Sequence, residues 1–538
     1  MAINSGDDWG TIRDQLNAIF VTPPSFDTVQ QLLASTASTF GGAGAIIEAG
    51  GFRYEVAATG AADHHLTTSG GVKLYVRYAN GEFDVRAFGA KGDGTTDDTS
   101  AIQKALNTAN AFPGWATVTV NPSGGEYIFT SLSVGTKTVF QSKGGILKLK
   151  DSVCVSAGTN YYPISNLGAT DTWFKELLVD GNGANNTAFN VADAITCVGE
   201  NSKITNCHIW DAPDSGIMFS AAKNGMCCDN RVDGASDTCI YVNADEASDK
   251  LYGAIVRGNV CTGGVYGGIN IKRGSAHIVV ANNTIRECGN AFTFEEFGVG
   301  NGGTPGPLII EGNLARDIGY MYRSASPNPS ETGINLQLAE NVILRGNHFY
   351  NVSGTVIGLD GAVGCVVEGN IVVGYQSDPN TAGYGNVGLL VKTRDSVTPS
   401  GNVIANNVIM DIADEGMYLQ NGTDCTVTGN TVSGTVGTNQ CMRIETTFLN
   451  SVITGNMLHG NSIDLTVASG TSGNIIKDNI QANGTGVAKS GMRRSTAVTT
   501  PVGNFTPLFA GEMIHITIGS KVFFATGTTN TDWVEITG

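Results

Sequence analysis

The sequence is poor in charged and in aromatic residues. Only 15% of its 538 residues are Asp, Glu, Lys or Arg, against roughly 25% in an average globular domain, and 8% are aromatic. This composition excludes a disordered chain or a coiled coil. Because 41% of the residues are hydrophobic but few are aromatic, we expect an interior of Val, Ile, Leu and Ala, which suits thin, repeated layers.

Positive charge and long apolar runs are also scarce. Lys and Arg total 31 against 48 Asp and Glu, a formal net charge of −17, so a nucleic-acid partner is excluded for want of a basic face. No apolar run reaches 18 residues, and residues 1–8 carry neither the cationic nor the apolar part of a secretory signal. We therefore expect synthesis in the cytoplasm and no membrane insertion.

The sequence has no CxxC pair among its eleven cysteines. They are scattered through apolar, strand-like segments, so we predict free, buried thiols. The Gly-rich run at 92–96 lacks the Gly-Lys-Ser/Thr ending of a phosphate loop, and neither a metal-spaced His cluster nor a Ser-His-Asp order stands out. No cofactor and no metal site are predicted.

A short phrase recurs from residue 200 onward: an Asn, usually after Gly, Asn or Asp, followed within one or two positions by an apolar residue. The shorter spacings cluster at 23 to 26 residues. The Asn positions are Asn206, Asn230, Asn259, Asn283, Asn313, Asn347, Asn370, Asn407, Asn430, Asn456 and Asn479. We expect these Asn residues at corners, where Asn tolerates left-handed backbone angles or bonds the Asn one turn away.

A second phrase, with strict apolar alternation, follows most of these Asn residues. Examples are GIMFS at 216–220, GINIK at 268–272 and GMYLQ at 416–420, and a period of two predicts strands. A unit of about 23 residues with two or three short strands is typical of one turn of a parallel β-helix. Three turns are overlong, at 296–307, 316–332 and 373–387, and we expect loops there that border a binding surface.

The flanks of the repeat differ in pattern. Residues 1–82 combine a short helix around 11–20 with a polar linker. We assign them to an N-terminal neck and attachment region. Residues 83–490 form the β-helix, closed by an amphipathic capping helix at about 98–109 with an Asp/Thr N-cap. Residues 491–538 resume alternation and are predicted to form a terminal β-hairpin domain.

The phrase VRAFGAKGDGTTDDTSAIQKAL at 85–106 resembles the entry motif of the pectate-lyase-like right-handed β-helix superfamily, common in bacteriophage tailspikes and capsule depolymerases. Residues 26–36 and 50–76 resemble a tailspike neck, and residues 511–538 resemble the hairpin that ends such proteins. The resemblance implies an all-β, right-handed parallel β-helix and a homotrimer. It also implies a place in the phage tail, with the N-terminus docked on a baseplate or tail adaptor and a bacterial surface polysaccharide as ligand.

The outward side chains that end the second strand of each turn are expected to form a ladder. Only three carboxylates stand in it, and Glu295 and Asp360 lie two turns apart, about 9.6 Å between backbones. Inverting glycosidases separate their carboxyl groups by about 6.5 to 9.5 Å, so we predict Glu295 and Asp360 as acid and base of a glycoside hydrolase. Glu296 would raise the pKa of the acid, Lys272 would lower it, and Glu445 is a lesser catalytic candidate.

Substrate-binding candidates accompany these carboxylates. Tyr320 and Tyr375 lie in the overlong turns, where they are predicted to stack on sugar rings. The cationic and amide candidates are Lys272, Arg273, Gln337 and Lys392. A polysaccharide lyase, with Lys or Arg neutralising a uronate carboxylate, and a non-catalytic receptor-binding spike remain alternatives. Solvated surface ion pairs are the ordinary role of such residues.

Overall fold

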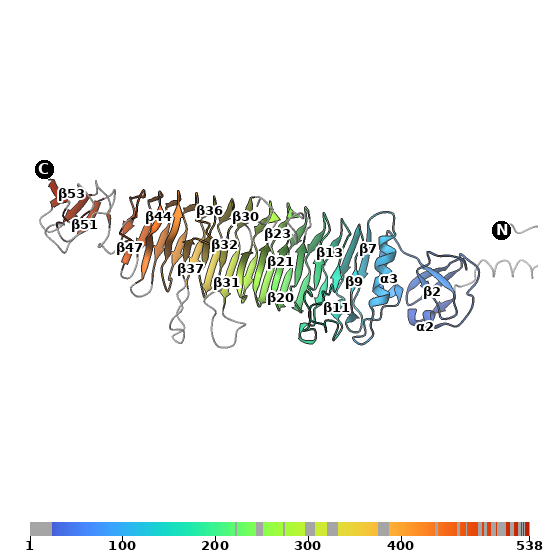
Figure 1. The fold of residues 1–538 in the computed structure, drawn as a ribbon. Coiled ribbons are helices and arrows are strands. Elements are labelled where there is room, and N and C mark those ends of the chain that lie inside the picture. Colours follow the sequence, from blue (N-terminus) through green and yellow to red (C-terminus); the bar gives the residue numbers. More distant parts are fainter. Residues whose placement is uncertain are drawn as a thin grey trace, which may run out of the picture. The chain divides into compact units, whose positions relative to one another are not determined.

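A computed structural model gives the conformation of residues 24–220, 223–243, 251–272, 275–295, 307–319, 332–374, 387–435, 439–459, 463–469 and 471–481, with short pieces between 487 and 536. The predicted fold class is confirmed: the chain is almost entirely β and forms a right-handed parallel β-helix. Its three long sheets have 15, 14 and 13 strands (Figure 1). The helix predicted around residues 11–20 lies outside the described residues.

The chain divides into two compact units, residues 1–148 and 149–538. The first unit contains helix α2 (Val29–Ala34) and a five-stranded sheet in the order β1-β2-β3-β5-β4. Thr28 and Gln31 form a reciprocal capping box at the start of α2. The strands of that sheet are β1 (Ser25–Phe26), β2 (Ile46–Ala49), β3 (Phe52–Val56), β4 (Leu66–Thr67) and β5 (Lys73–Val76).

A capping helix, α3 (Thr99–Asn110), lies where the spacing predicts one and buries Ile102, Ala105, Leu106 and Ala109. Asp98 occupies the expected N-cap position, but not as a side-chain cap. The Asp98 carboxylate makes no cap bond to the helix and instead accepts the backbone N–H groups of Lys91 and Gly92. Asp98 therefore fixes the Gly-rich turn before the helix. The neighbouring elements are β6 (Glu82–Asp84), the 3-10 helix η1 (Val85–Phe88), β7 (Ala116–Val120), β8 (Tyr127–Phe129), β9 (Leu132–Ser133), β10 (Thr138–Ser142) and β11 (Ile146–Leu149).

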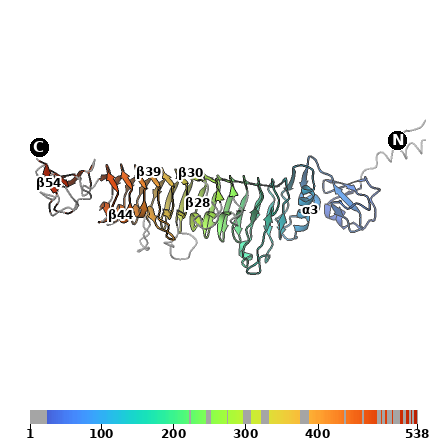
Figure 2. The same cartoon turned by 45° about the horizontal axis from the view of Figure 1, so that its top comes forward.

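Each turn of the second unit contributes one short strand to each of three parallel sheets (Figure 2). Its first sheet contains β13 (Trp173–Lys175), β16 (Lys203–Thr205), β19 (Met226–Cys228), β23 (Ile255–Arg257), β27 (Val279–Ala281), β30 (Leu308–Glu311), β33 (Val342–Arg345), β36 (Val366–Glu368), β39 (Val403–Ala405), β42 (Thr426–Thr428), β45 (Val452–Thr454) and β48 (Ile475–Lys477).

The second sheet contains β14 (Leu178–Asp180), β17 (His208–Ala212), β20 (Arg231–Ala235), β24 (Val260–Gly264), β28 (Thr284–Arg286), β31 (Leu314–Ile318), β34 (His348–Val352), β37 (Ile371–Val373), β40 (Val408–Met410), β43 (Thr431–Ser433), β46 (Met457–His459) and β49 (Ile480–Gln481). Smaller elements are the 3-10 helix η2 (Gly183–Asn185) and the pair β22 (Leu251–Tyr252) and β26 (Ser275–Ala276).

The third sheet carries the strands that the alternating phrase predicts. It contains β12 (Ile164–Ser165), β15 (Ile195–Cys197), β18 (Ile217–Ser220), β21 (Thr238–Asn243), β25 (Gly267–Lys272), β29 (Asn290–Glu295), β32 (Ile334–Gln337), β35 (Ile357–Asp360), β38 (Leu389–Lys392), β41 (Met417–Thr423), β44 (Gln440–Leu449) and β47 (Ile463–Val467). The inward pairs from Ile217 and Phe219 to Met442 and Ile444 are fully buried and form the core.

The recurring Asn residues form a buried hydrogen-bond ladder between the first and second sheets. Asn313 donates its backbone N–H and its Nδ2 to Asn347 Oδ1, at 3.0 and 2.8 Å, and Asn347 repeats this pattern with Asn370. The ladder runs from Asn230 to Asn479, with every member at most 1% exposed. Asn206 was expected in it but is an exposed turn residue at φ +55°, because Cys207 takes the ladder position.

The cysteine prediction is confirmed, since all eleven thiols are free and buried. At the C-terminal end, β50 (Val487–Ala488), β51 (Met492–Ser495), β52 (Met513–Ile516), β53 (Lys521–Ala525) and β54 (Trp533–Ile536) form a five-stranded sheet in that order. The hairpin expected there is present, because β52 pairs antiparallel with β53. Within the described residues, none of the helices has the length and apolar character that a membrane crossing requires.

We expect replacement of Asn347 by Leu to lower the free energy of unfolding by about 2–4 kcal/mol, because the N–H of Asn313 and the carbonyl of Ile310 lose their partners while buried. Denaturant unfolding monitored by circular dichroism measures the change. Asn206→Gly is the matched control, since glycine accepts a positive φ and the site is exposed. Equal losses for both variants would contradict a structural ladder.

Candidate active site

Several predicted site residues fall outside what the structure describes. Residues Arg273, Glu296, Tyr320 and Tyr375 lie outside the described residues, as does most of each of the three overlong turns. For Lys272 and Glu295 only the backbone is described. They end β25 and β29 and are direct partners in the parallel pairing of these strands. The predicted catalytic role of Glu295 and Glu296 therefore stays a prediction.

The structure brings Gln337, Asp360 and Lys392 together as successive partners at the ends of β32, β35 and β38. Asp360 was expected to face solvent, but its side chain is 2% exposed. Its Oδ2 accepts Asn335 Nδ2 at 3.0 Å and lies 3.3 Å from Lys392 Nζ. Arg394 NH1 lies 4.0 Å from the same oxygen. Asp360 is thus enclosed and paired with two cations, an arrangement that suits an anchoring group.

Glu445, the last of the predicted carboxylates, belongs to a separate cluster in β41 and β44. Arg443 NH2 lies 2.6 Å from Glu445 Oε1, and Tyr418 donates its hydroxyl to the same oxygen at 3.3 Å. Arg443 also pairs with Glu415 at 3.2 Å and stacks over the Tyr418 ring. Burial and the neighbouring Glu415 raise the pKa of Asp414 to about 6. Glu445 is thus held by an arginine, several turns from Asp360.

A group of carboxylates that was not predicted from the sequence lies in the N-terminal part of the third sheet. Asp193, Asp214 and Asp237 lie one to three residues before β15, β18 and β21, which are consecutive partners. The three side chains line one cavity of about 330 Å³. Its remaining walls come from the outer face of the sheet, including Thr196, Met218 and Tyr241, and from the segments at 160–167 and 190–191.

Burial raises the pKa values of Asp193 and Asp214 by different amounts. Asp193 is 2% exposed, and burial, reinforced by the charge of Asp214, raises its pKa to about 8. Asp193 Oδ1 accepts the Ser215 N–H at 3.3 Å, and Asp193 Oδ2 has no partner among the described residues. Burial raises the pKa of Asp214 to about 6, although Asp214 Oδ2 accepts the Ala192 N–H at 3.2 Å. Near neutral pH the cavity therefore combines a protonated carboxyl with an ionised one.

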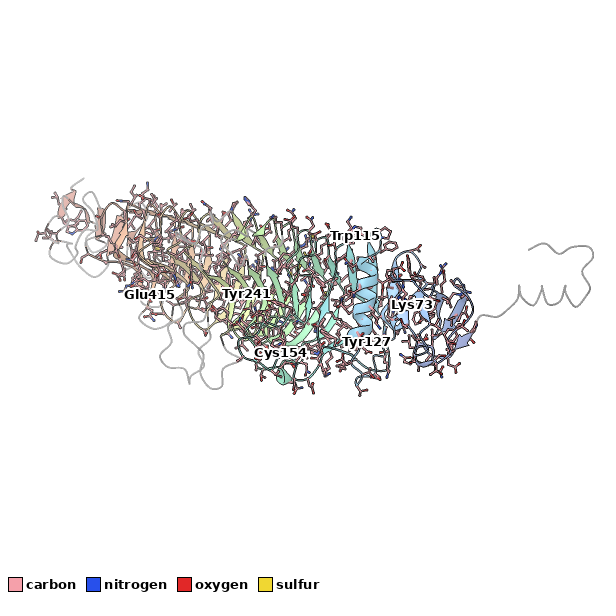
Figure 3. The ribbon with its side chains drawn as sticks, turned by 45° about the vertical axis from the view of Figure 1, so that its right-hand side comes forward. Lys73, Trp115, Tyr127, Cys154, Tyr241 and Glu415 are labelled. Carbon is pink, nitrogen blue, oxygen red and sulfur yellow. The ribbon has the colours of Figure 1, made fainter. Side chains whose placement is uncertain are left out.

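The rim of this cavity is aromatic and apolar. Tyr162 and Tyr241 are partly exposed, and Leu167 is 49% exposed. Tyr241 stands on β21 of the third sheet (Figure 3). Asn160 donates its Nδ2 to the Tyr162 hydroxyl at 3.2 Å and accepts Asn190 Nδ2 at 2.7 Å, which fixes one wall. Flat apolar faces beside hydrogen-bonding groups are the usual lining of a site for small polar rings.

The sequence does contain a signal for this cavity, an Asp that recurs just before successive strands of the third sheet. Asp214 and Asp237 each stand three residues before the first inward Ile of their strand, Ile217 and Ile240, and Asp193 stands two residues before Ile195. The prediction considered only the outward residues that end these strands. Among the described residues, no cluster of three or more His, Cys, Asp or Glu side chains is arranged to hold a metal ion.

Comparisons with known proteins agree with this architecture. A family profile described as "Rhamnogalacturonase A/epimerase, pectate lyase-like" matches residues 83–301, which contain the acidic cavity. A profile described as "Right handed beta helix region" matches residues 294–437. These matches support a place in the pectate-lyase-like superfamily of right-handed β-helices.

The particular relatives are phage and polysaccharide-related proteins. The preneck appendage protein of Bacillus phage PZA is 22% identical over 337 residues, covering 55% of this chain and 38% of the relative. The match thus spans less than half of that protein. Among solved structures, the bacteriophage phi29 gene product 12 has a TM-score of 0.52 at 17% identity, covering 78% of this chain and 60% of its own.

The A-module of the Azotobacter vinelandii mannuronan C-5 epimerase AlgE6 has a TM-score of 0.51 at 17% identity, covering 74% of this chain and 99% of the module. At such identities both structural likenesses establish the fold alone.

The raised pKa of Asp193 makes stability depend on pH. Its folded-state pKa lies above the unfolded value, so the folded state retains a proton that the unfolded chain releases, and stability falls as pH rises from about 4 to about 8. We expect Asp193→Asn to gain about 3 kcal/mol relative to wild type between pH 5 and pH 8. Denaturant unfolding at both values measures this.

The matched control is Asp211→Asn, because Asp211 is exposed and does not line the cavity. Parallel pH profiles for wild type and Asp193→Asn would contradict a buried, protonated Asp193.

Proposed function

We propose that this protein is a phage tailspike depolymerase that binds a bacterial surface polysaccharide, capsule or O-antigen, and cleaves it by glycoside hydrolysis. The observation that carries the proposal is the cavity in which the buried, protonated Asp193 adjoins Asp214 and Asp237 beneath a rim of tyrosines. Two carboxyl groups in different protonation states are what glycosidic bond cleavage requires.

In this mechanism Asp193 donates its proton to the glycosidic oxygen as the bond from that oxygen to the anomeric carbon breaks. Asp237 takes a proton from a water molecule whose oxygen attacks the anomeric carbon from the opposite face. Asp193 and Asp237 belong to turns two strands apart, about 9.6 Å between backbones, which leaves room for that water. The geometry therefore favours inversion of configuration. Burial, reinforced by the charge of Asp214 between them, keeps the proton on Asp193.

The relatives support a biological setting for this proposal. Preneck appendage proteins are virion components by name, and an alginate lyase of Azotobacter vinelandii is 34% identical over 113 residues of this chain. We infer a homotrimeric virion protein, made in the host cytoplasm and attached through its N-terminus to a baseplate or tail adaptor. Its acidic net charge and acidic cavity favour neutral or amino-bearing sugars in the cleavage site.

Two alternatives have distinct readouts. A lyase acting by β-elimination would produce an unsaturated sugar that absorbs in the ultraviolet, with Lys392 and Arg394 neutralising a uronate carboxylate. A non-catalytic receptor-binding spike would retain polysaccharide without shortening it. Release of saturated reducing ends favours hydrolysis over both.

We expect Asp193→Asn and Asp237→Asn each to lower turnover of a susceptible polysaccharide by about a thousandfold while leaving its binding intact, because each removes a proton-transfer step. Reducing-end release and polymer retention on a column measure the two effects. Wild-type turnover should decline above about pH 8, where Asp193 loses its proton. Full activity in both variants would contradict this assignment.

The carboxylate pair predicted from the sequence is tested in the same assay. If Glu295 and Asp360 are the acid and base, Glu295→Gln and Asp360→Asn lower turnover by orders of magnitude with folding preserved. Unchanged turnover in these two variants, together with loss in Asp193→Asn, assigns the chemistry to the acidic cavity. The reverse result assigns it to the Glu295 and Asp360 pair and contradicts our proposal for Asp193.

A further inference from the structure

The acidic cavity holds carboxyl groups without a cation beside them. Three of its described lining residues are Asp, and none of them is Lys, Arg or His. Asp214, with a pKa of about 6, is mostly ionised at pH 7. An acidic sugar in the cavity would therefore place its own negative charge beside a like charge, with no cation among the described lining residues to offset the repulsion. The cavity thus disfavours uronate, sulfated and phosphorylated sugars.

The cavity also has an apolar edge, formed by Leu167 and Val198. Asp193 lies two residues before β15 and Val198 one residue after it, so they lie at opposite ends of this strand. Leu167 follows β12, the parallel partner of β15, at the same end as Val198. Thr196 and Met218, which are direct partners, form the floor between the two edges. At about 3.3 Å per residue, the stretch from Asp193 to Val198 spans at most about 16 Å, so a sugar at the carboxyl groups lies close to the apolar edge.

The apolar edge departs from the pattern of the later turns. Val198 follows Cys197, whose partner is Phe219, so the counterpart of Val198 in the next turn is Ser220. From β18 to β38 this position carries only polar or charged residues, namely Ser220, Asn243, Lys272, Glu295, Gln337, Asp360 and Lys392. The change to apolar residues coincides with the acidic cavity. We infer that it serves the cavity and not the stacking of the turns.

The fold leaves part of this apolar edge uncovered. Leu167 is 49% exposed, and Val198 is only partly buried. Covering such aliphatic surface with apolar atoms of a ligand is favourable, whereas a hydroxyl or carboxylate placed there would lose water without gaining a hydrogen bond. Met218 in the floor offers a thioether, which is a weak acceptor and no donor. The edge therefore favours a small apolar substituent, and a methyl group is the one that sugars commonly carry.

We propose that the sugar bound beside Asp193 and Asp214 is uncharged and carries a methyl group that lies against Leu167, Val198 and Met218. This methyl group is either C6 of a 6-deoxy sugar or the end of an acetyl substituent. The inference rests on the proposed function and deepens it, because it names the class of sugar next to the bond that is cleaved.

The first test compares sugars that differ at one position. The probes are hexoses of the galacto, gluco and manno series in both enantiomers, each in its 6-deoxy, parent and uronate form, and 2-amino sugars with and without the N-acetyl group. We expect the methyl-bearing form to bind about five- to tenfold more tightly than its parent in at least one series, because it covers aliphatic surface. The uronate should bind more weakly than the parent. Saturation-transfer NMR with the full-length protein measures both affinity and contact with the methyl protons.

A matched pair of variants locates the preference. Leu167→Asn should lower it to less than twofold while the affinity for the parent sugar stays unchanged, and Leu167→Met should retain it. Ile475→Asn is the control, because Ile475 is 52% exposed and does not line the cavity. Circular dichroism confirms that the variants are folded. Equal affinity for methyl-bearing and parent forms wherever a sugar binds, or a preference that survives in Leu167→Asn, would overturn the inference.

The products of cleavage test the inference independently of monosaccharide affinity. In any purified capsule or O-antigen that the protein shortens, we expect mass spectrometry to find a 6-deoxy, N-acetylated or O-acetylated sugar at one of the two new ends. Mild alkali beforehand removes only O-acetyl groups, so slower cleavage afterwards identifies that source of the methyl group.

The remaining outcomes separate this inference from the proposed function. New ends that lack a methyl group would overturn the inference and leave the proposed hydrolysis standing. A preference for methyl-bearing sugars in a protein that shortens none of the polysaccharides would contradict the hydrolysis and leave the binding preference standing. A protein that binds none of the sugars and shortens none of the polysaccharides would overturn both.

Discussion

The fold depends on one repeated hydrogen bond, from each buried Asn to the next Asn along the stack. Every Asn amide from Asn230 to Asn456 is satisfied by its successor, and Asn479 bonds back to the carbonyl of Ile453. A turn cannot slip relative to its neighbour without leaving these groups unpaired in the core. Within the turns that the ladder spans, this constraint makes positions far apart in the sequence, such as Gln337 and Asp360, into neighbours.

Periodicity predicted most of the fold because residues that contact each other in successive turns of a solenoid recur at nearly constant intervals in the sequence. The inward pairs, the capping helix and the ladder from Asn230 onward followed from apolar alternation and Asn spacing. The prediction for Asn206 failed because an Asn at a left-handed turn and an Asn in the buried ladder have the same sequence pattern around them. The two positions are only one residue apart in the chain. Asp98 is the predicted N-cap residue, but its carboxylate accepts N–H groups from the preceding Gly-rich turn and not from the helix.

The candidate site was harder to predict than the fold, for a physical reason. Register identifies which residues are neighbours, and it correctly aligned Asp360 with Gln337 and Lys392. Burial and proton affinity depend on what covers those residues. Asp360 proved to be enclosed beside cations, whereas Asp193, Asp214 and Asp237, in the corner before the strands, share a cavity whose walls come from segments with no repeat of their own.

Stacking of similar turns separates the length of the molecule from the geometry of any one part of it. Whole turns can be gained or lost, each bringing its own Asn to the ladder, while the corner that carries Asp193, Asp214 and Asp237 keeps its neighbours. Duplication or loss of a turn elsewhere would change the length of the β-helix and leave that cavity as it is. Such a scaffold lets length and local chemistry evolve independently.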